Sequence, residues 1–320
     1  MTPLLHQTPT SGYARIVVAA TVWGSIALLV RATDAHPAVI VFWRVLFAAL
    51  AIGAYMAIKG RLHELPALPG RTKIRIAAMG VLLTLNWVLF LGALTLTKVA
   101  VAVLLGYLGP VFVAVLNPIV SRQRFDRRIL FPLVLALAGT AIIVGPQDLS
   151  LEDPQHLLGA SLALASSFTY ALLIVFVKRL LKGIPASTYM LGEYLVAATV
   201  LLPAALLLQG PVGATEWAAL ATLGTVHTAF TGALFLTGLR LVPADRAAIL
   251  TYAEPVSAVA FAALFLGERV SVTTLLGGAA VVAAGITVAR LAPAQTATVE
   301  GPPVPVTASD EPLEADTGRS

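Results

Sequence analysis

The chain contains no cysteine, and charged residues make up only 12% of its 320 positions. The lack of cysteine excludes disulfide bonds and thiolate-bound metal ions. The lack of charge sets the chain apart from soluble globular domains, in which Asp, Glu, Lys and Arg usually account for about 25% of residues. A His-Glu-x-x-His motif, a paired-Asp motif and a nucleotide-binding loop are also missing. The sequence therefore predicts no metal site, no cofactor and no enzymatic reaction.

Long apolar segments take up most of the chain. Hydrophobic residues account for 58% of it and the mean hydropathy is +0.89, the balance of an integral membrane protein. Crossing a bilayer core of roughly 30 Å requires about 20 residues of helix at 1.5 Å per residue. We therefore predict an all-α integral membrane fold with ten transmembrane helices, at residues 14–31, 38–58, 74–95, 100–120, 129–145, 157–178, 187–208, 216–238, 245–266 and 271–291.

The end of the chain has a different composition. Residues 292–320 hold five prolines, five acidic residues and one arginine, so we predict a disordered tail. Because the whole chain has a formal net charge of +5 and the tail has −4, the membrane part carries +9. In a membrane protein such a surplus reports on topology, and we infer no nucleic-acid partner from it.

Basic residues are concentrated in alternate loops. One set of loops holds sixteen Lys and Arg, whereas the other holds only Arg31, Lys98 and Arg269. Short loops rich in Lys and Arg stay in the cytoplasm. We therefore predict a multi-pass protein of the cell membrane, with a short N-terminal segment at 1–13 and the tail at 292–320 both cytoplasmic.

An internal repeat is visible around two prolines. LLGYLGPVFVAVLNPIVSRQRF at 104–125 aligns without gaps on ILTYAEPVSAVAFAALFLGERV at 249–270, and the alignment places Pro110 on Pro255. The same alignment pairs the two tyrosines that stand three residues before each proline. The fourth predicted helix is thus a copy of the ninth.

The first and sixth helices match in the same way, with Trp23 at the position of Tyr170. We therefore predict two five-helix repeats, at 14–145 and 157–291, joined by an outer linker at 146–156. Because five is odd, the second repeat must cross the membrane in the opposite sense to the first. Inverted repeats are typical of secondary transporters, whose substrate sites lie near the midplane between the halves.

Short motifs at corresponding places carry a family resemblance. They are Trp23-Gly24 in the first helix, Phe42-x-Arg44 entering the second, the proline-centred fourth and ninth helices, and Leu266-Gly267-Glu268 ending the ninth. Over residues 14–291 the chain resembles the EamA branch of the drug/metabolite transporter superfamily. It departs from the pattern at Gln123, where members often have Glu. The resemblance implies a ten-helix exporter or exchanger of small metabolites such as amino acids.

Glu254 and Pro255 stand side by side inside an apolar segment. About nine residues into its helix, Glu254 lies roughly 13 Å inside the membrane core. A carboxylate there is costly unless it is paired, hydrated or protonated. Pro255, like Pro110, removes a helix donor and frees nearby carbonyls to face a cavity. We interpret Glu254 as a substrate or proton site, the alternative being a neutral carboxyl group that joins two helices.

Other polar residues are predicted at comparable depth. His227 titrates near physiological pH and could relay protons, although a single histidine in an apolar helix more often joins helices by a hydrogen bond. Asn86 has the same two interpretations. Tyr107 and Tyr252, which are equivalent in the repeat, complete this group of substrate-binding candidates.

Four further residues stand out, of which Arg44 and Glu193 lie toward the ends of their helices. Arg44 could bind a substrate carboxylate through two hydrogen bonds, or extend to the outer interface. Trp23 and Tyr170 could line a cavity, or pack against lipid. Glu193 is expected to form a structural ion pair with Lys182 or Arg179 at the inner surface.

A secondary transporter accounts best for the repeat, the buried charges and the lack of large soluble domains. A polytopic membrane enzyme, a channel, and an importer of a vitamin, nucleoside or drug-like amine are the alternatives. The expected partners are a small-molecule substrate and the lipid bilayer. Coupling to protons stays open, and so does a homodimer, because the small residues at 275–285 permit close helix packing.

Overall fold

The computed structural model describes residues 8–144, 153–267 and 270–291. Within these ranges all regular structure is helical, and the predicted ten membrane-spanning segments are confirmed, at Pro9–Val30, Pro37–Ile58, Gly70–Leu96, Val101–Ser121, Arg127–Val144, Pro154–Leu180, Ala186–Leu207, Ala214–Leu241, Ala244–Phe265 and Val272–Arg290. The predicted tail, the start of the N-terminal segment, most of the linker at 146–156 and Glu268 lie outside the described residues.

Six spans are continuous or nearly so. They are α3 (Pro37–Ile58), α5 (Gly70–Leu96), α8 (Leu130–Val144, after a 3₁₀ turn at Arg127–Ile129), α9 (Pro154–Leu180), α10 (Ala186–Leu207) and α15 (Val272–Arg290). A short α4 (Glu64–Ala67) lies in the loop before α5.

Four spans are interrupted. They consist of α1 (Pro9–Trp23) with α2 (Ile26–Val30), α6 (Val99–Gly106) with α7 (Gly109–Ser121), α11 (Ala214–Gly224) with α12 (Thr231–Leu241) across a π-helical turn at Thr225–Phe230, and α13 (Ala244–Leu250) with α14 (Ala253–Leu266). These are the first, fourth, eighth and ninth spans.

Two of the interruptions have a direct cause in the sequence. A proline cannot donate to the carbonyl four residues earlier, and its ring crowds that carbonyl. For Pro110 this is the carbonyl of Gly106, the last residue of α6, and for Pro255 it is that of Thr251, the residue after α13. The fourth and ninth spans therefore break at nearly equivalent points of the two repeats.

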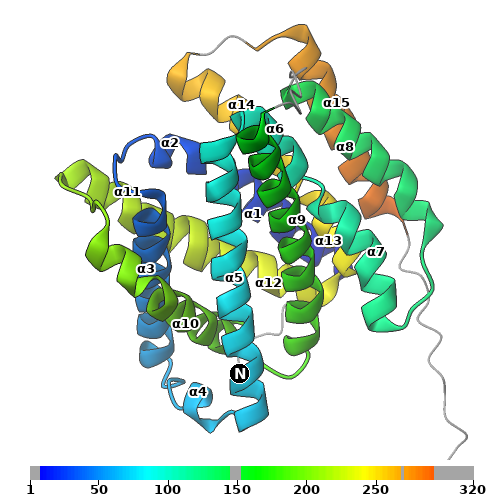
Figure 1. Ribbon diagram of the computed structural model, residues 1–320. Coiled ribbons are helices and arrows are strands. Elements are labelled where there is room, and N and C mark those ends of the chain that lie inside the picture. Colours follow the sequence, from blue (N-terminus) through cyan, green and yellow to red (C-terminus); the bar gives the residue numbers. More distant parts are fainter. Residues whose placement is uncertain (1–7, 145–152, 268–269, 292–320) are drawn as a thin grey trace, which may run out of the picture.

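Helix packing follows the repeat. In Figure 1, α5 runs beside α9 and α8 runs beside α15. The contact between α5 and α9 joins the third span to the sixth. The equivalent contact in the repeat joins α12, in the eighth span, to α1, in the first. The remaining close pairs, α3 with α10 and α8 with α15, each join two equivalent spans. Every main contact between the halves is thus either duplicated or formed by equivalent helices.

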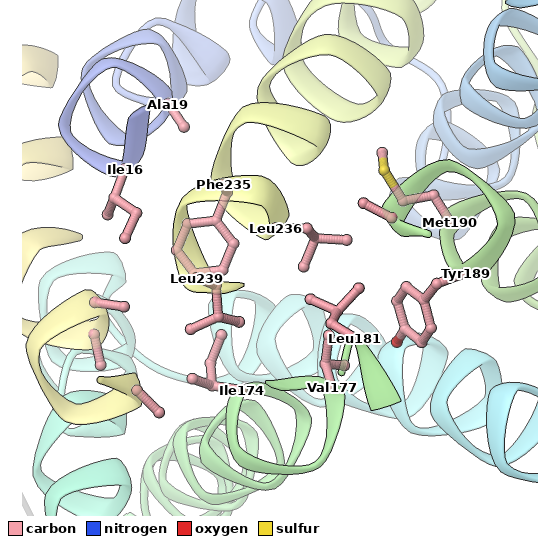
Figure 2. Packing of buried hydrophobic residues seen from close by; sticks show 14 of the residues in the cluster. Ile16, Ala19, Ile174, Val177, Leu181, Tyr189, Met190, Phe235, Leu236 and Leu239 are labelled. Atoms are coloured by element: carbon pink, nitrogen blue, oxygen red, sulfur yellow. The ribbon is translucent and has the colours of Figure 1, made fainter. Parts of the chain in front are cut away.

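The central core lies where α1, α9, α10 and α12 meet. Figure 2 shows Phe235 and Leu239 of α12 between Ile16 of α1 and Ile174 of α9. Ile16 and Leu239 are completely inaccessible to solvent, and Phe235 is buried. Large apolar side chains on the outward faces, such as those of α8 and α15, are exposed instead. That distribution suits a protein whose outer surface contacts lipid.

Close approach of α8 and α15 depends on two glycines. A Cβ atom built at Gly139 would lie 2.6 Å from the carbonyl oxygen of Gly277, and one built at Gly277 would lie 2.6 Å from that of Gly139. No side chain fits in this space. The small residues predicted to permit close packing thus form a contact within the chain, between the last helices of the two repeats.

Candidate functional site

Arg44 of α3 lies half-buried between the repeats. Its Nε donates a hydrogen bond to Thr228 Oγ1 at 2.6 Å. Its guanidinium also lies over the ring of Trp87, with Cζ 4.6 Å from the ring centroid. A cation in this position is attracted by the π-electrons of the indole. Contacts from both repeats therefore orient Arg44. The alternative expected from the sequence, in which its side chain extends to the outer interface, does not apply.

The π-helical turn presents Thr228 to Arg44. Thr228 Oγ1 donates to the carbonyl of Leu223, five residues earlier, at 2.8 Å. Because its proton is used there, the oxygen can accept from Arg44. Tyr194 of α10 donates to the carbonyl of Thr228 at 3.3 Å. Turns of this wide type occur frequently at functional sites. Thr228 was not among the predicted site residues, although the threonines around His227 in the sequence were an available signal.

Glu254 lies in the first turn of α14, directly after the break in the ninth span. Helix N-termini favour negative charge, because their first N–H groups lack helical partners. Glu254 is half-buried. No described residue donates a hydrogen bond to its carboxylate or pairs with it. Glu254 and Arg44 lie in the same region, so one repeat supplies a basic and the other an acidic side chain to it.

Three tyrosines lie in the same region as Glu254. The rings of Tyr107 and Tyr252 have centroids 6.0 Å apart, and Tyr252 donates to the carbonyl of Tyr107 at 2.6 Å. Tyr107 and Tyr170 are both within electrostatic reach of Glu254. The hydroxyl of Tyr170 is buried and lies near the side chain of Thr251, but no hydrogen bond of normal geometry joins it to a described residue. An unsatisfied buried hydroxyl is costly, and it is free to bind a ligand.

Trp23 and His227 form a second group beside the break in the first span. Trp23 Nε1 donates to Thr231 Oγ1 at 2.8 Å and to the carbonyl of His227 at 3.1 Å. The Nε2 atom of His227 lies 2.8 Å from Ser25 Oγ. Ser25 Oγ also lies 2.8 Å from the carbonyl of Val22, and Nδ1 of His227 lies 3.4 Å from the carbonyl of Thr222. These bonds attach the first span to the eighth.

Asn86 joins α5 to α9. Its Nδ2 donates to the carbonyl of Ser166 at 2.6 Å and to Thr169 Oγ1 at 3.0 Å. Ser166 returns a bond to the carbonyl of Asn86 at 3.1 Å. All three residues are buried. Both amide protons are thus used within the protein, which suits a structural junction between helices.

Glu193 has a different partner from the one expected. The hydroxyl of Tyr189, one turn earlier in α10, donates to Glu193 Oε1, and both residues are buried. The expected ion pair with Lys182 or Arg179 is wrong. A carboxyl group this deep is satisfied at lower cost by a neutral hydroxyl on the same helix than by a charge at the surface.

A cavity of about 360 Å³ lies at the end of the molecule predicted to face outward. It is lined by residues of α2, α8, α14 and α15 and of the adjoining turns, among them Gly24, Arg31, Ala258 and Thr274. A Cβ atom at Gly24 would lie 2.8 Å from the carbonyl oxygen of Glu254. The candidate residues do not line this cavity. The close contact of α1 with α14 at Gly24 separates them from it.

Arg246 lies at the opposite end of the molecule and is only 1% exposed. Its guanidinium donates to the hydroxyl of Tyr13 at 3.2 Å, to Asp126 Oδ2 at 3.3 Å and to the carbonyl of Leu291. These partners belong to the first span, the loop between the fourth and fifth, and the end of the tenth. The contacts fasten the predicted inner ends of both repeats together.

Comparison with known proteins identifies the family. The model of the EamA-like transporter family matches residues 10–145 and 157–290. The chain belongs to this family. The resemblance inferred from the motifs is confirmed, and the chain is a multi-pass membrane transporter and not an enzyme. Among the described residues no group of three or more His, Asp or Glu could hold a metal ion.

Relatives of this EamA protein cover nearly the whole chain. An "Uncharacterized transporter" of Archaeoglobus fulgidus is 30% identical over 276 residues, which is 85% of this chain and 94% of the relative. The "Uncharacterized transporter YxxF" of Bacillus subtilis is 26% identical over 273 residues, covering 82% and 84%. A solved structure titled "Crystal structure of protein" has a TM-score of 0.76 at 20% identity, covering 87% of this chain and 97% of that one. At this identity the likeness shows the fold alone.

Proposed function

We propose that this EamA transporter exports or exchanges small zwitterionic metabolites such as amino acids. The observation that carries the proposal is that Arg44 and Glu254, a basic and an acidic side chain from different repeats, lie in the same interior region beside a broken helix. An amino acid carries the complementary pair, a carboxylate for the guanidinium and an ammonium for the carboxylate. Both residues are half-buried, so part of each side chain is accessible to a substrate.

The proposed contacts follow from the bonds that are already used. Thr228 occupies Nε of Arg44, which leaves the two terminal nitrogens for a substrate carboxylate. The substrate ammonium lies against Glu254, with Tyr107 beside it. The unpartnered hydroxyl of Tyr170 supplies a further hydrogen bond. Asn86, Trp23, His227 and Tyr252 hold the helices that carry these groups, and Trp23 also borders the site.

Alternating access between the inverted repeats is the proposed mechanism. The cavity at the predicted outer end and the Arg246 contacts at the inner end support an outward-directed state, in which the contact at Gly24 still separates the cavity from the candidate residues. Exchange of the packing between equivalent helices would close the first end and open the second. The breaks beside Pro110 and Pro255 provide points where the spans can bend. Glu254 and His227 are the groups proposed to carry a proton if transport is coupled to one.

Exchange assays in proteoliposomes test the substrate class. Vesicles loaded with a mixture of unlabelled amino acids are given one radiolabelled amino acid at a time, and uptake is compared with protein-free vesicles. We expect counterflow for at least one zwitterion and none for its decarboxylated amine. Absence of counterflow for every amino acid, with protein that is monodisperse and folded, refutes the substrate class.

Substitutions test the site. Glu254→Gln and Arg44→Gln should each lower apparent affinity roughly 10- to 100-fold, because a hydrogen bond to a charged group contributes about 1.5–3 kcal/mol. Glu216→Gln is the matched control, since it removes a carboxylate on α11 away from the site. If Glu254→Gln keeps exchange but loses the pH dependence of transport, the carboxylate carries a proton and does not bind the ammonium. Parental transport in both site variants rules out the site.

A further inference from the structure

A groove on the lipid-facing surface combines apolar walls with two arginines. Its volume is about 440 Å³, and it lies between α5 of the first repeat and α9 of the second. The lining residues are Arg75, Ala78, Met79, Phe176, Arg179 and Leu180. Ala78 and Phe176 are exposed. Such a mixture is unlike the site around Arg44, which lies in the interior.

Neither arginine has a partner in the part of the chain that the structure describes. Arg75 and Arg179 are both exposed, and no described residue forms an ion pair or hydrogen bond with either guanidinium. Some other basic side chains at this end do bind carbonyls or carboxylates, as Lys178 does with the carbonyls of Leu239 and Val242. Arg75 and Arg179 therefore remain available for an anion.

The position of the pair matches the membrane surface. Arg75 lies near the start of α5 and Arg179 near the end of α9, so both lie at the predicted inner ends of their spans. The apolar residues continue from there toward the membrane centre. At the equivalent positions of the other repeats the chain has Leu220 and Ala32. The charge is thus confined to one end of the molecule.

We propose that this groove binds an anionic phospholipid of the inner leaflet, with its phosphate between Arg75 and Arg179. One acyl chain then lies along Met79 and Phe176. Basic pockets between membrane helices on the cytoplasmic side are suited to anionic headgroups. Because the arginines come from different repeats, the bound lipid holds α5 against α9. The proposal is independent of the transported substrate.

The test measures lipid retained by the full-length protein. Protein in detergent is incubated with phosphatidylglycerol or phosphatidylcholine, and bound lipid is counted by native mass spectrometry. We expect phosphatidylglycerol to bind selectively. Arg75→Gln and Arg179→Gln should each weaken binding roughly fivefold, and the double variant about 25-fold. Arg127→Gln with Arg128→Gln is the matched control, because it removes the same charge at the same end outside the groove.

A second variant tests the groove without changing charge. Ala78→Phe fills the apolar part and should weaken phosphatidylglycerol binding while leaving the arginines in place. Displacement of the lipid by millimolar inorganic phosphate would show a simple phosphate site and overturn the assignment to a lipid. Equal binding of both lipids, equal loss in the Arg127/Arg128 control, or parental binding in the double variant would each overturn it as well. Thermal unfolding of every variant identifies losses caused by misfolding.

Discussion

Substitution of Asp126 by Asn should open the predicted inner end of the transporter. Asp126 Oδ2 accepts from Arg246 Nη2 at 3.3 Å, and the exposed fractions of the two side chains are 19% for Asp126 and 2% for Arg246. Arg246 keeps its bonds to Tyr13 and Leu291 in the variant. The guanidinium is therefore not left without partners, and the protein should still fold.

The expected magnitude follows from distance and exposure. Two unit charges 3.3 Å apart attract each other by about 5 kcal/mol at an effective dielectric constant of 20 and by about 1 kcal/mol in bulk water. Because the Asp126 side chain is partly exposed and Arg246 has other hydrogen-bond acceptors, the attraction between the two charges should be closer to the bulk-water value. A loss of about 1–2 kcal/mol changes the ratio of the two transport states roughly 5- to 30-fold.

Cysteine labelling measures this ratio. The chain has no cysteine of its own, so a single introduced thiol gives no background. Ala258→Cys reports on the outer cavity, which Ala258 lines. Ala248→Cys reports on the inner end, where Ala248 is completely buried. With Asp126→Asn, labelling at 248 should become faster and labelling at 258 slower, by factors within the range given above.

Two controls define what would refute the reasoning. Asp153→Asn removes a carboxylate at the opposite end, where Asp153 caps α9, and should not accelerate labelling at 248. The effects of Asp126→Asn and Arg246→Gln should be less than additive, because both remove the same contact. Unchanged labelling in Asp126→Asn, or fully additive effects, would show that the contact does not hold the inner end closed.

Three further outcomes are expected. Tyr170→Phe removes a hydroxyl without a partner, so it should leave thermal stability unchanged or raise it slightly while weakening substrate affinity; equal affinity would show that the hydroxyl is not used. Gly139→Ala should destabilise the purified protein by about 1–3 kcal/mol through overpacking, measured as a lower Tm, and an unchanged Tm would contradict the close contact. Donation first from Arg61 and then from Thr188 lowers the pKa of Glu64 from its ordinary value. This contact is present above the ordinary pKa and is lost as pH falls through the lowered one. NMR titration of the carboxyl should show the pKa returning toward normal in Arg61→Gln.

The sequence predicted the spans well because the membrane imposes a simple requirement. Each span must be apolar over about 20 residues, so composition alone locates it. The breaks at residues 107–108 and 251–252 follow from Pro110 and Pro255, because each proline lacks the N–H group that would donate to the carbonyl four residues earlier. The π-helical turn at Thr225–Phe230 has no proline and was not predicted. Its wide turn depends on packing against α3, which no local pattern records.

Contacts between distant segments of the chain were the main feature that the sequence did not predict. Arg246 was interpreted as one of the basic residues that set topology, although it is among the most buried side chains. Its partners Asp126 and Tyr13 are 120 and 233 positions away, and no spacing rule links residues that far apart. Glu193 was a different case. Tyr189 stands four residues before it, a spacing that brings side chains together on a helix, so its true partner could have been found.

The repeat also explains why the candidate site has one carboxylate and not two. The alignment places Gly109 at the position of Glu254, and a Cβ atom at Gly109 would lie 2.6 Å from the ring of Tyr170. In the first repeat, therefore, an aromatic ring occupies the space that a side chain at 109 would need. The counterpart of Tyr170 in the repeat is Trp23, whose indole donates a hydrogen bond to Thr231. The counterpart of Gly109 is Glu254, so on that side the chain has a carboxyl group instead of a glycine. A second carboxylate near the symmetry axis would repel the first and compete for Arg44. Divergence at this one pair of positions leaves a single carboxyl group, as the proposed binding of one substrate ammonium requires.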